Sequence, residues 1–248
     1  MREPCFESLR AGGFVWRIAL PLDDAARAVL EDPAKIFRDL ALSLHSGRST
    51  VVGVGATFAV KRYNPRVEFR RFNTYRRAFC APRLAFHALE MSARLRAAGF
   101  PAARIFAAAQ RRESWRGWLG YCVAERIPDL VALNDWHGER RKVLLTLAVF
   151  LAMLHRDGFS HRDLSGTNVL LDPHGNPVLV DLDDVEFFGE VSMQRAALDL
   201  KWFSNQLALQ PPLRPREAAR FLIQYAQRRG EGSSRTWLLK ILDQTRRR

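Results

Sequence analysis

The segment HRDLSGTN, residues 161–168, constrains the fold more than any other part of the chain. It follows an apolar run, Val143 to Leu154, that has the length and composition of a buried helix. Two short apolar segments come next, and they predict a strand pair around a turn at Pro173–Asn176. A loop between the end of a helix and a strand can hold Asp163 and Asn168 on the same edge of a site. The second strand of the pair would end at Asp181.

This order of an acid, an amide five positions later and a further acid after a strand pair has a known chemical use. The pattern H-R-D-x-x-x-x-N is that of the catalytic loop of protein kinases. It predicts Asp163 as the base that receives the acceptor hydroxyl proton, and Asn168 and Asp181 as magnesium ligands, with Asp181 bridging Mg²⁺ to the phosphates of ATP. The alternative is an ordinary polar loop with an Asx turn.

A second H-R-D triplet in the same chain can be compared with this motif. His155-Arg156-Asp157 is an earlier H-R-D, but Arg162 stands where the amide should be. The amide, the strand pair and the third acid therefore distinguish the second copy. After Asp181 the sequence continues Leu-Asp-Asp, without D-F-G, A-P-E or a long activation segment, which argues against a protein substrate. Asp183 and Asp184 are either further acids near the metal or solvated turn carboxylates.

The first half of the chain predicts extended segments at 14–21, 49–55 and 57–63, with a helical stretch at 23–39. The strand at 57–63 carries Lys61 in Phe-Ala-Val-Lys, similar to the kinase strand lysine that contacts the phosphates. An outward strand lysine is the alternative. A turn at RRESWRG is predicted between two later strands.

A helix from Pro82 to Gly99 should supply the partner acid of Lys61. Glu90 is the expected partner, with Glu68 as a second candidate. Glu90 could instead form a surface i,i+4 pair with Arg94.

Two further segments complete the predicted nucleotide site, and one acid has a predicted structural role. Gly47, in Ser46–Ser49, is the best candidate for a phosphate-covering loop, although it is a single glycine. Glu125 to Ile127 occupies the expected hinge, where backbone groups would meet adenine. Asp199 is a candidate for a buried acid that braces the catalytic loop.

Together these patterns predict an α+β chain with two lobes. Residues 1–126 should form a small antiparallel β N-lobe with one main helix, and residues 127–248 a mostly α C-lobe. At 248 residues and 48% hydrophobic composition, the chain can bury a core of this size. The longest apolar run is shorter than the roughly 20 residues that span a bilayer, and no signal peptide is evident, so a cytoplasmic address is expected.

The chain resembles the kinase-like phosphotransferases, and among them the bacterial lipopolysaccharide core kinases that phosphorylate Kdo or heptose. The resemblance covers roughly residues 40 to 205. It rests on VKRY with the basic loop after it, on LEMSARLRAAGFPAARIF, and on LHRDGFSHRDLSGTNVLLD followed by LVDLDD. It implies a bilobal protein-kinase-like fold and magnesium-dependent transfer of the ATP γ-phosphate to a sugar hydroxyl at the inner membrane. Another small molecule, a protein Ser/Thr, or a non-catalytic regulatory role are the alternatives.

The net charge of +13 favours polyanionic partners. Arginines crowd residues 62–83 and alternate with aromatic residues, a composition suited to peripheral contact with an anionic membrane beside a glycolipid acceptor. A solvated loop is the alternative. Nucleic acid is not an expected partner, because no recognised nucleic-acid module accompanies the arginines.

Overall fold

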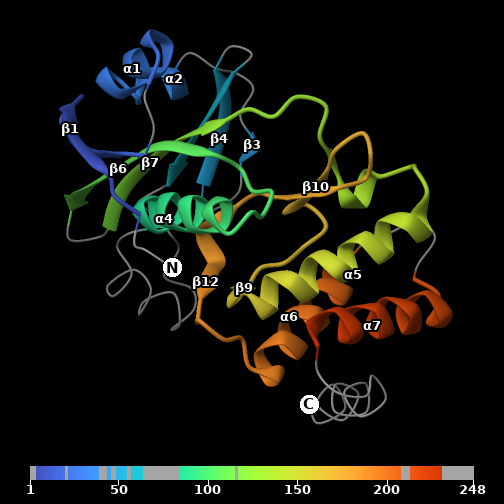
Figure 1. Ribbon diagram of the computed structural model, residues 1–248. Coiled ribbons are helices and arrows are strands. Elements are labelled where there is room, and N and C mark those ends of the chain that lie inside the picture. Colours follow the sequence, from blue (N-terminus) through green and yellow to red (C-terminus); the bar gives the residue numbers. More distant parts are fainter. Residues whose placement is uncertain are drawn as a thin grey trace. The chain divides into compact units, whose positions relative to one another are not determined.

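The structure, a computed structural model, describes residues 4–19, 22–38, 44–45, 49–54, 57–63, 84–114, 117–207 and 213–230 (Figure 1). Its contacts divide the chain into two compact units. The first comprises Met1–Arg96 with Ala103–Pro128, and the second comprises Ala97–Ala102 with Asp129–Arg248. None of the helices in the described residues is long and apolar enough to cross a membrane.

An antiparallel sheet forms the first unit, and in the described residues its strand order is β1-β2-β6-β7-β5-β4-β3. The strands are β1 Glu7–Ala11, β2 Phe14–Ile18, β3 Leu44–His45, β4 Ser49–Val54, β5 Phe58–Tyr63, β6 Ile105–Ser114 and β7 Gly117–Glu125. The predicted strand at 57–63 is confirmed as β5, between β4 and β7. A strand in that position has both backbone edges paired, so its side chains are held firmly on the two faces.

Helices cover the two faces of this sheet (Figure 1). Helix α1 (Asp24–Glu31) packs Val29 and Leu30 into a core with Trp16 and Tyr121. Helix α4 (Leu84–Ala97) lies on the other face, where Cys122 Sγ is 3.4 Å from the Ala85 carbonyl. Neighbouring residues of a strand point to opposite faces, so Tyr121 and Cys122 contact different helices.

Two expectations for this unit were wrong in detail. The helix expected at 23–39 is broken: α1 ends at Glu31, and α2 begins at Lys35 and is described to Arg38. Pro33 lacks a backbone N–H and excludes the residue before it from helical geometry, which explains the break. The turn expected at RRESWRG is mostly strand, because β6 runs to Ser114 and pairs with Gly117 of β7. Because strands pair through their backbone groups, the polar side chains of this segment do not prevent β6 from extending to Ser114.

Helices dominate the second unit: α5 (Arg140–Arg156), α6 (Met193–Gln206) and α7 (Pro215–Arg229). Strand β10 (Val169–Leu171) pairs with β11 (Pro177–Leu179) and with β8 (Val131–Ala132), and β9 (Phe159–His161) pairs with β12 (Val185–Phe187). Short 3-10 turns lie at Leu133–Asp135 and Leu182–Asp184. The helix expected from Val143 to Leu154 is confirmed and lies within α5.

The connection after α4 belongs to the second unit. Phe100 packs edge-on against Phe150 of α5 and Phe159 of β9. Pro101 accepts a backbone hydrogen bond from Leu179 at 3.0 Å, and Ala102 bridges to the same residue. These contacts anchor the end of β11, which leads directly to Asp181.

Candidate active site

The β10–β11 hairpin brings Asn168 and Asp181 to the same end of the strand pair. Val169 pairs with Leu179, and one step further the Val180 N–H donates to the Asn168 carbonyl at 3.0 Å. Asp181 follows immediately. The hairpin register therefore places an amide and a carboxylate as neighbours, although they are 13 residues apart in sequence.

The loop before the hairpin is closed by Asn168. Its side-chain Nδ2 donates to the Asp163 carbonyl at 2.8 Å, and its backbone N–H donates to Ser165 at 3.1 Å. Because the amide nitrogen takes the Asp163 carbonyl, the amide oxygen points away from it. At Gly166 an added Cβ would overlap the side-chain amide of Asn134, so a larger residue would require that side chain to move.

Asp163 is half-buried and receives a hydrogen bond from Trp202 of α6. The indole Nε1 donates to Oδ1 at 3.2 Å. Among the described residues, no donor reaches Oδ2. One carboxylate oxygen is therefore fixed by the protein, and the other is available to a substrate hydroxyl.

Asp181 has an unusual backbone for a non-glycine residue. Its φ of 55° and ψ of 64° lie in the left-handed region, and its side chain is exposed. Aspartate tolerates this region better than most residues, but the conformation still costs free energy and is common at functional sites. The 3-10 turn that follows contains Asp183 and Asp184, and the Asp184 carbonyl accepts from the Arg162 N–H at 3.0 Å.

The donor set at the end of the hairpin fits magnesium. Asn168 and Asp181 offer an amide oxygen and a carboxylate, the hard oxygen ligands that Mg²⁺ prefers. No group of three or more His, Cys, Asp or Glu side chains that could hold a metal occurs in the part of the chain that the structure describes. Mg²⁺ ordinarily takes one or two carboxylates and completes its shell with substrate phosphates and water, so two protein ligands suffice.

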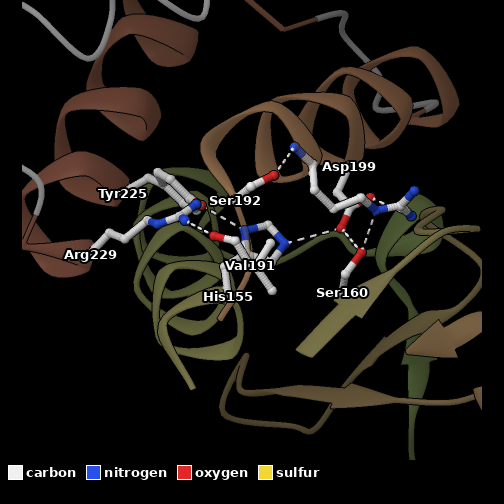
Figure 2. Close-up of polar contacts among 8 residues, drawn as sticks. His155, Ser160, Val191, Ser192, Asp199, Tyr225 and Arg229 are labelled. Carbon is white, nitrogen blue, oxygen red and sulfur yellow. Dashed lines mark hydrogen bonds and ion pairs between the residues drawn. The ribbon is translucent and has the colours of Figure 1, made fainter. Parts of the chain in front are cut away.

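A buried polar network supports the strand that enters the loop (Figure 2). Asp199 of α6, which is 2% exposed, accepts from Ser160 Oγ of β9 and pairs with Arg195 at 3.0 Å. Arg195 Nε also donates to Ser160 Oγ at 2.8 Å. Since Ser160 is followed by His161, Arg162 and Asp163, the predicted bracing role of Asp199 has a direct structural basis.

The network continues through His155 to α7 (Figure 2). His155 Nε2 lies 3.4 Å from Asp199 Oδ2, and Nδ1 lies 2.6 Å from the Tyr225 hydroxyl. Arg229 donates to that hydroxyl at 3.0 Å and also to the Val191 carbonyl. The donors thus run in one direction, from Arg229 through Tyr225 to Nδ1, which assigns the proton of a neutral His155 to Nε2, facing Asp199.

Burial controls the charge of both histidines in this region. It lowers the pKa of His155 below its ordinary value of 6.5, against the opposing effect of Asp199. Burial likewise lowers the pKa of His161, against the charge of Asp181. Both imidazoles are therefore neutral at physiological pH.

The first H-R-D has a structural role. His155 is the hub of the buried network, and Asp157 is the C-cap residue of α5, where its N–H donates to Met153 at 2.9 Å. The Asp157 side chain pairs with its neighbour Arg156 at 3.0 Å. The sequence comparison that favoured the second copy is consistent with this arrangement.

Lys61 lies in the middle of β5, directly opposite Cys122 of β7. Residues directly opposite in an antiparallel pair share a face, so Lys61 projects on the α4 side of the sheet. Its Nζ is 5.0 Å from the centroid of the Tyr63 ring. Glu90, on α4, is ion-paired with Arg94 at 2.9 Å, and its pairing with Lys61 stays a prediction. Glu68 lies outside the described residues.

The predicted hinge follows β7. The Glu125 N–H donates to the Arg104 carbonyl at 2.8 Å, and the Glu125 side chain lies 3.9 Å from Arg104 Nε. The backbone of Ile127 makes no hydrogen bond within the described residues, and its contact with adenine stays a prediction. Gly47 lies outside the described residues, as does 64–83 of the basic segment.

Comparison with known proteins identifies the family of this chain. The sequence model of the lipopolysaccharide kinase (Kdo/WaaP) family matches residues 47–225. The chain belongs to this family. The matched span contains Lys61, Asp163, Asn168 and Asp181, together with the whole β10–β11 hairpin.

Individual proteins match this chain over different lengths. Mus musculus serine/threonine-protein kinase 16 is 38% identical over 68 residues, which is 27% of this chain and 20% of that kinase. The chain therefore spans only a fifth of the curated relative's length. A structure of WaaP in complex with acyl carrier protein matches with a TM-score of 0.60 at 19% identity, covering 85% of this chain and 87% of that one. Monomeric WbdD matches with a TM-score of 0.49 at 18% identity, over 79% of this chain and 44% of that one.

The structural match confirms the kinase-like α+β fold for this family member. The sequence did not indicate several residues that the structure brings to the site. The contacts of Trp202 with Asp163, Tyr225 with His155 and Arg229 with Val191 join residues 38 to 70 positions apart. The one available signal was Asp199, an acid in an apolar helix, with Trp202 following three positions later on the same helix.

Proposed function

We propose that this member of a kinase family transfers the γ-phosphate of ATP to a sugar hydroxyl, Kdo or heptose, of the lipopolysaccharide inner core. The observation that carries the proposal is the closed loop in which Asn168 bonds to Asp163 and neighbours Asp181. Family membership supports the lipopolysaccharide acceptor.

In the proposed reaction the acceptor hydroxyl gives its proton to the Asp163 carboxylate. The acceptor oxygen forms a bond to the γ-phosphorus while the bond from that phosphorus to the β–γ bridging oxygen breaks, and ADP leaves with the electron pair. Asp163 suits the role because Trp202 fixes its Oδ1 and no donor of the described residues occupies Oδ2.

Asn168 and Asp181 would hold magnesium, which when bound supplies positive charge to the phosphate oxygens. The nucleotide roles of residues in the first unit rest on motif position. Lys61 would contact the phosphates with Glu90 as its partner acid, Glu125 and Ile127 would meet adenine, and Gly47 would cover the phosphates. Residues 1–126 and 127–248 would thereby act as the nucleotide and catalytic lobes.

Contact of residues 62–83 with the membrane surface belongs to the same proposal. A glycolipid acceptor is embedded in an anionic bilayer, and basic residues gain roughly 1 kcal/mol each near such a surface. The support is the composition of the segment, in which arginines alternate with aromatic residues.

The test is phosphate transfer from Mg-ATP to a panel of purified acceptors, read by mass spectrometry as the gain of one phosphoryl group. The panel contains lipid A alone, lipid A with Kdo, and a heptose-containing core. We expect a gain on a Kdo or heptose acceptor and none on lipid A alone. Wild-type protein that binds nucleotide but modifies no sugar acceptor would contradict the proposal.

A further inference from the structure

Trp202 has its polar edge bonded to Asp163 and much of its ring in solvent. Its side chain is 43% exposed, while its Nε1 donates to Asp163 Oδ1 at 3.2 Å. Single exposed apolar side chains are normal on protein surfaces and need no explanation. The bond to the proposed base is the independent observation that distinguishes this one.

The hydrogen bond restrains the base. An indole N–H can only donate, and a bond from it to a carboxylate is stronger than one between neutral groups. Helix α6 is itself held firmly, since Leu200 and Phe203 on either side of Trp202 are buried. The bond therefore limits rotation of the Asp163 carboxylate and leaves Oδ2 for the incoming hydroxyl.

The same geometry puts the indole next to the acceptor. A general base must lie within about 3 Å of the hydroxyl whose proton it takes. Because Trp202 Nε1 is 3.2 Å from that carboxylate, a sugar ring that presents a hydroxyl to Asp163 lies beside the indole. An aromatic face is a large apolar surface with a polar edge, and it suits the C–H face of a pyranose.

We propose that Trp202 is a positioning residue for Asp163 and a contact surface for the acceptor sugar. The role of Trp202 as a contact for the acceptor sugar rests on the proposed function. Its role in positioning Asp163 rests only on the hydrogen bond between the two side chains. Leu198 provides a matched control. It lies one turn earlier on α6 and is also 43% exposed, but no described contact joins it to Asp163.

The first experiment separates kcat from the acceptor KM. Trp202→Phe keeps an aromatic ring and loses the N–H, so kcat should fall about 10- to 100-fold, the loss typical of a hydrogen bond to a charged group, while the acceptor KM stays within about twofold. Trp202→Ala should lower kcat as much and also raise the acceptor KM by about tenfold. Leu198→Ala should leave both within about twofold of wild type. Equal kcat for Trp202→Phe and wild type, or an equal loss in Leu198→Ala, would overturn the proposal.

The second experiment requires no substrate. The protein has six tryptophans, and ¹⁵N-labelled indole signals can be assigned to Trp202 with the Trp202→Phe variant. Asp163→Ala should move the Trp202 N–H signal, whereas Asp157→Ala should leave it in place, because that aspartate pairs with Arg156. An unmoved signal would overturn the positioning role whatever the acceptor. A moved signal, with wild type inactive on every sugar, would retain the positioning role but reject both the acceptor contact and the proposed function.

Discussion

Asn168 donates its side-chain amide to the backbone carbonyl of Asp163 at 2.8 Å, which fixes the separation of the proposed base and the proposed metal ligand. The bond closes the loop across five residues. Because the amide nitrogen is the donor, the amide oxygen is left for the proposed magnesium ligation.

Two variants separate these roles of Asn168. Asn168→Asp keeps an oxygen ligand but loses the donor to Asp163, whereas Asn168→Ala loses both. We expect the magnesium concentration for half-maximal activity to rise much more in Asn168→Ala than in Asn168→Asp. Both variants should lose about 10-fold or more in kcat because the loop is no longer closed. Equal magnesium dependence in wild type and Asn168→Ala would exclude Asn168 as a metal ligand.

Asp181→Asn should weaken magnesium-dependent nucleotide binding. The substitution removes the negative charge and leaves one amide oxygen in place of a carboxylate, the stronger ligand for a hard cation. Calorimetry with ATP, with and without Mg²⁺, measures the effect. Asp183→Asn, two residues along, is the control and should bind nucleotide like wild type. Similar losses in both variants would mean that the charge of the acidic turn matters rather than ligation by Asp181.

Removing the Tyr225 hydroxyl should destabilise the fold. Tyr225→Phe leaves His155 Nδ1 without its partner and deprives Arg229 of an acceptor, both in the core. An unsatisfied buried polar group costs about 1–3 kcal/mol, so the free energy of unfolding in urea should fall by about that amount. Ser204→Ala, which removes an exposed hydroxyl bonded to Lys201, should change it by less than about 0.5 kcal/mol. Unchanged stability in Tyr225→Phe would show that the buried network contributes nothing.

The buried histidines make stability fall with acidification. The folded-state pKa of His155 is below the unfolded value of 6.5, and the pKa of His161 is lowered as well. Between the two values the unfolded chain binds protons that the folded chain does not, so unfolding is favoured as pH decreases. The contribution is complete above pH 6.5 and declines below it, by at most about 1.4 kcal/mol per pH unit for each histidine.

Urea unfolding across this pH range tests the sign. Wild-type stability should decrease below pH 6.5, and His155→Gln should show a shallower slope because one of the titrating groups is gone. An increase in wild-type stability on acidification would contradict the account.

Local pattern was sufficient to predict the hairpin. The segments on either side of Pro173–Asn176 are apolar, and Asp172 Oδ1 accepts from the backbone of His174 at 2.9 Å and Asn176 at 2.8 Å. This turn chemistry is encoded within a few residues. The same holds for α5, which has a continuous apolar run, and for β5, which is rich in β-branched and aromatic residues.

The sequence pattern could not predict contacts between residues that are far apart in the chain. The bond from Trp202 to Asp163 depends on how α6 packs beside β9, and Tyr225 reaches His155 only through the packing of α7 on α5. Strand β1 was missed because ESLRA is largely exposed and has no apolar alternation; it pairs through its backbone alone. Glu90 was predicted from the kinase motif to pair with Lys61. The motif takes no account of Arg94, four residues later on the same helix, which forms an ion pair with Glu90.

The two H-R-D aspartates give the most direct test of the central claim. Phosphate transfer to the sugar acceptor would be measured in a single turnover for wild type, Asp163→Ala and Asp157→Ala. We expect a loss of about 10²–10⁴-fold for Asp163→Ala, as for a general base, and near wild-type transfer for Asp157→Ala. Wild-type transfer by Asp163→Ala, or an equal loss in both variants, would contradict the assignment of Asp163 as the base.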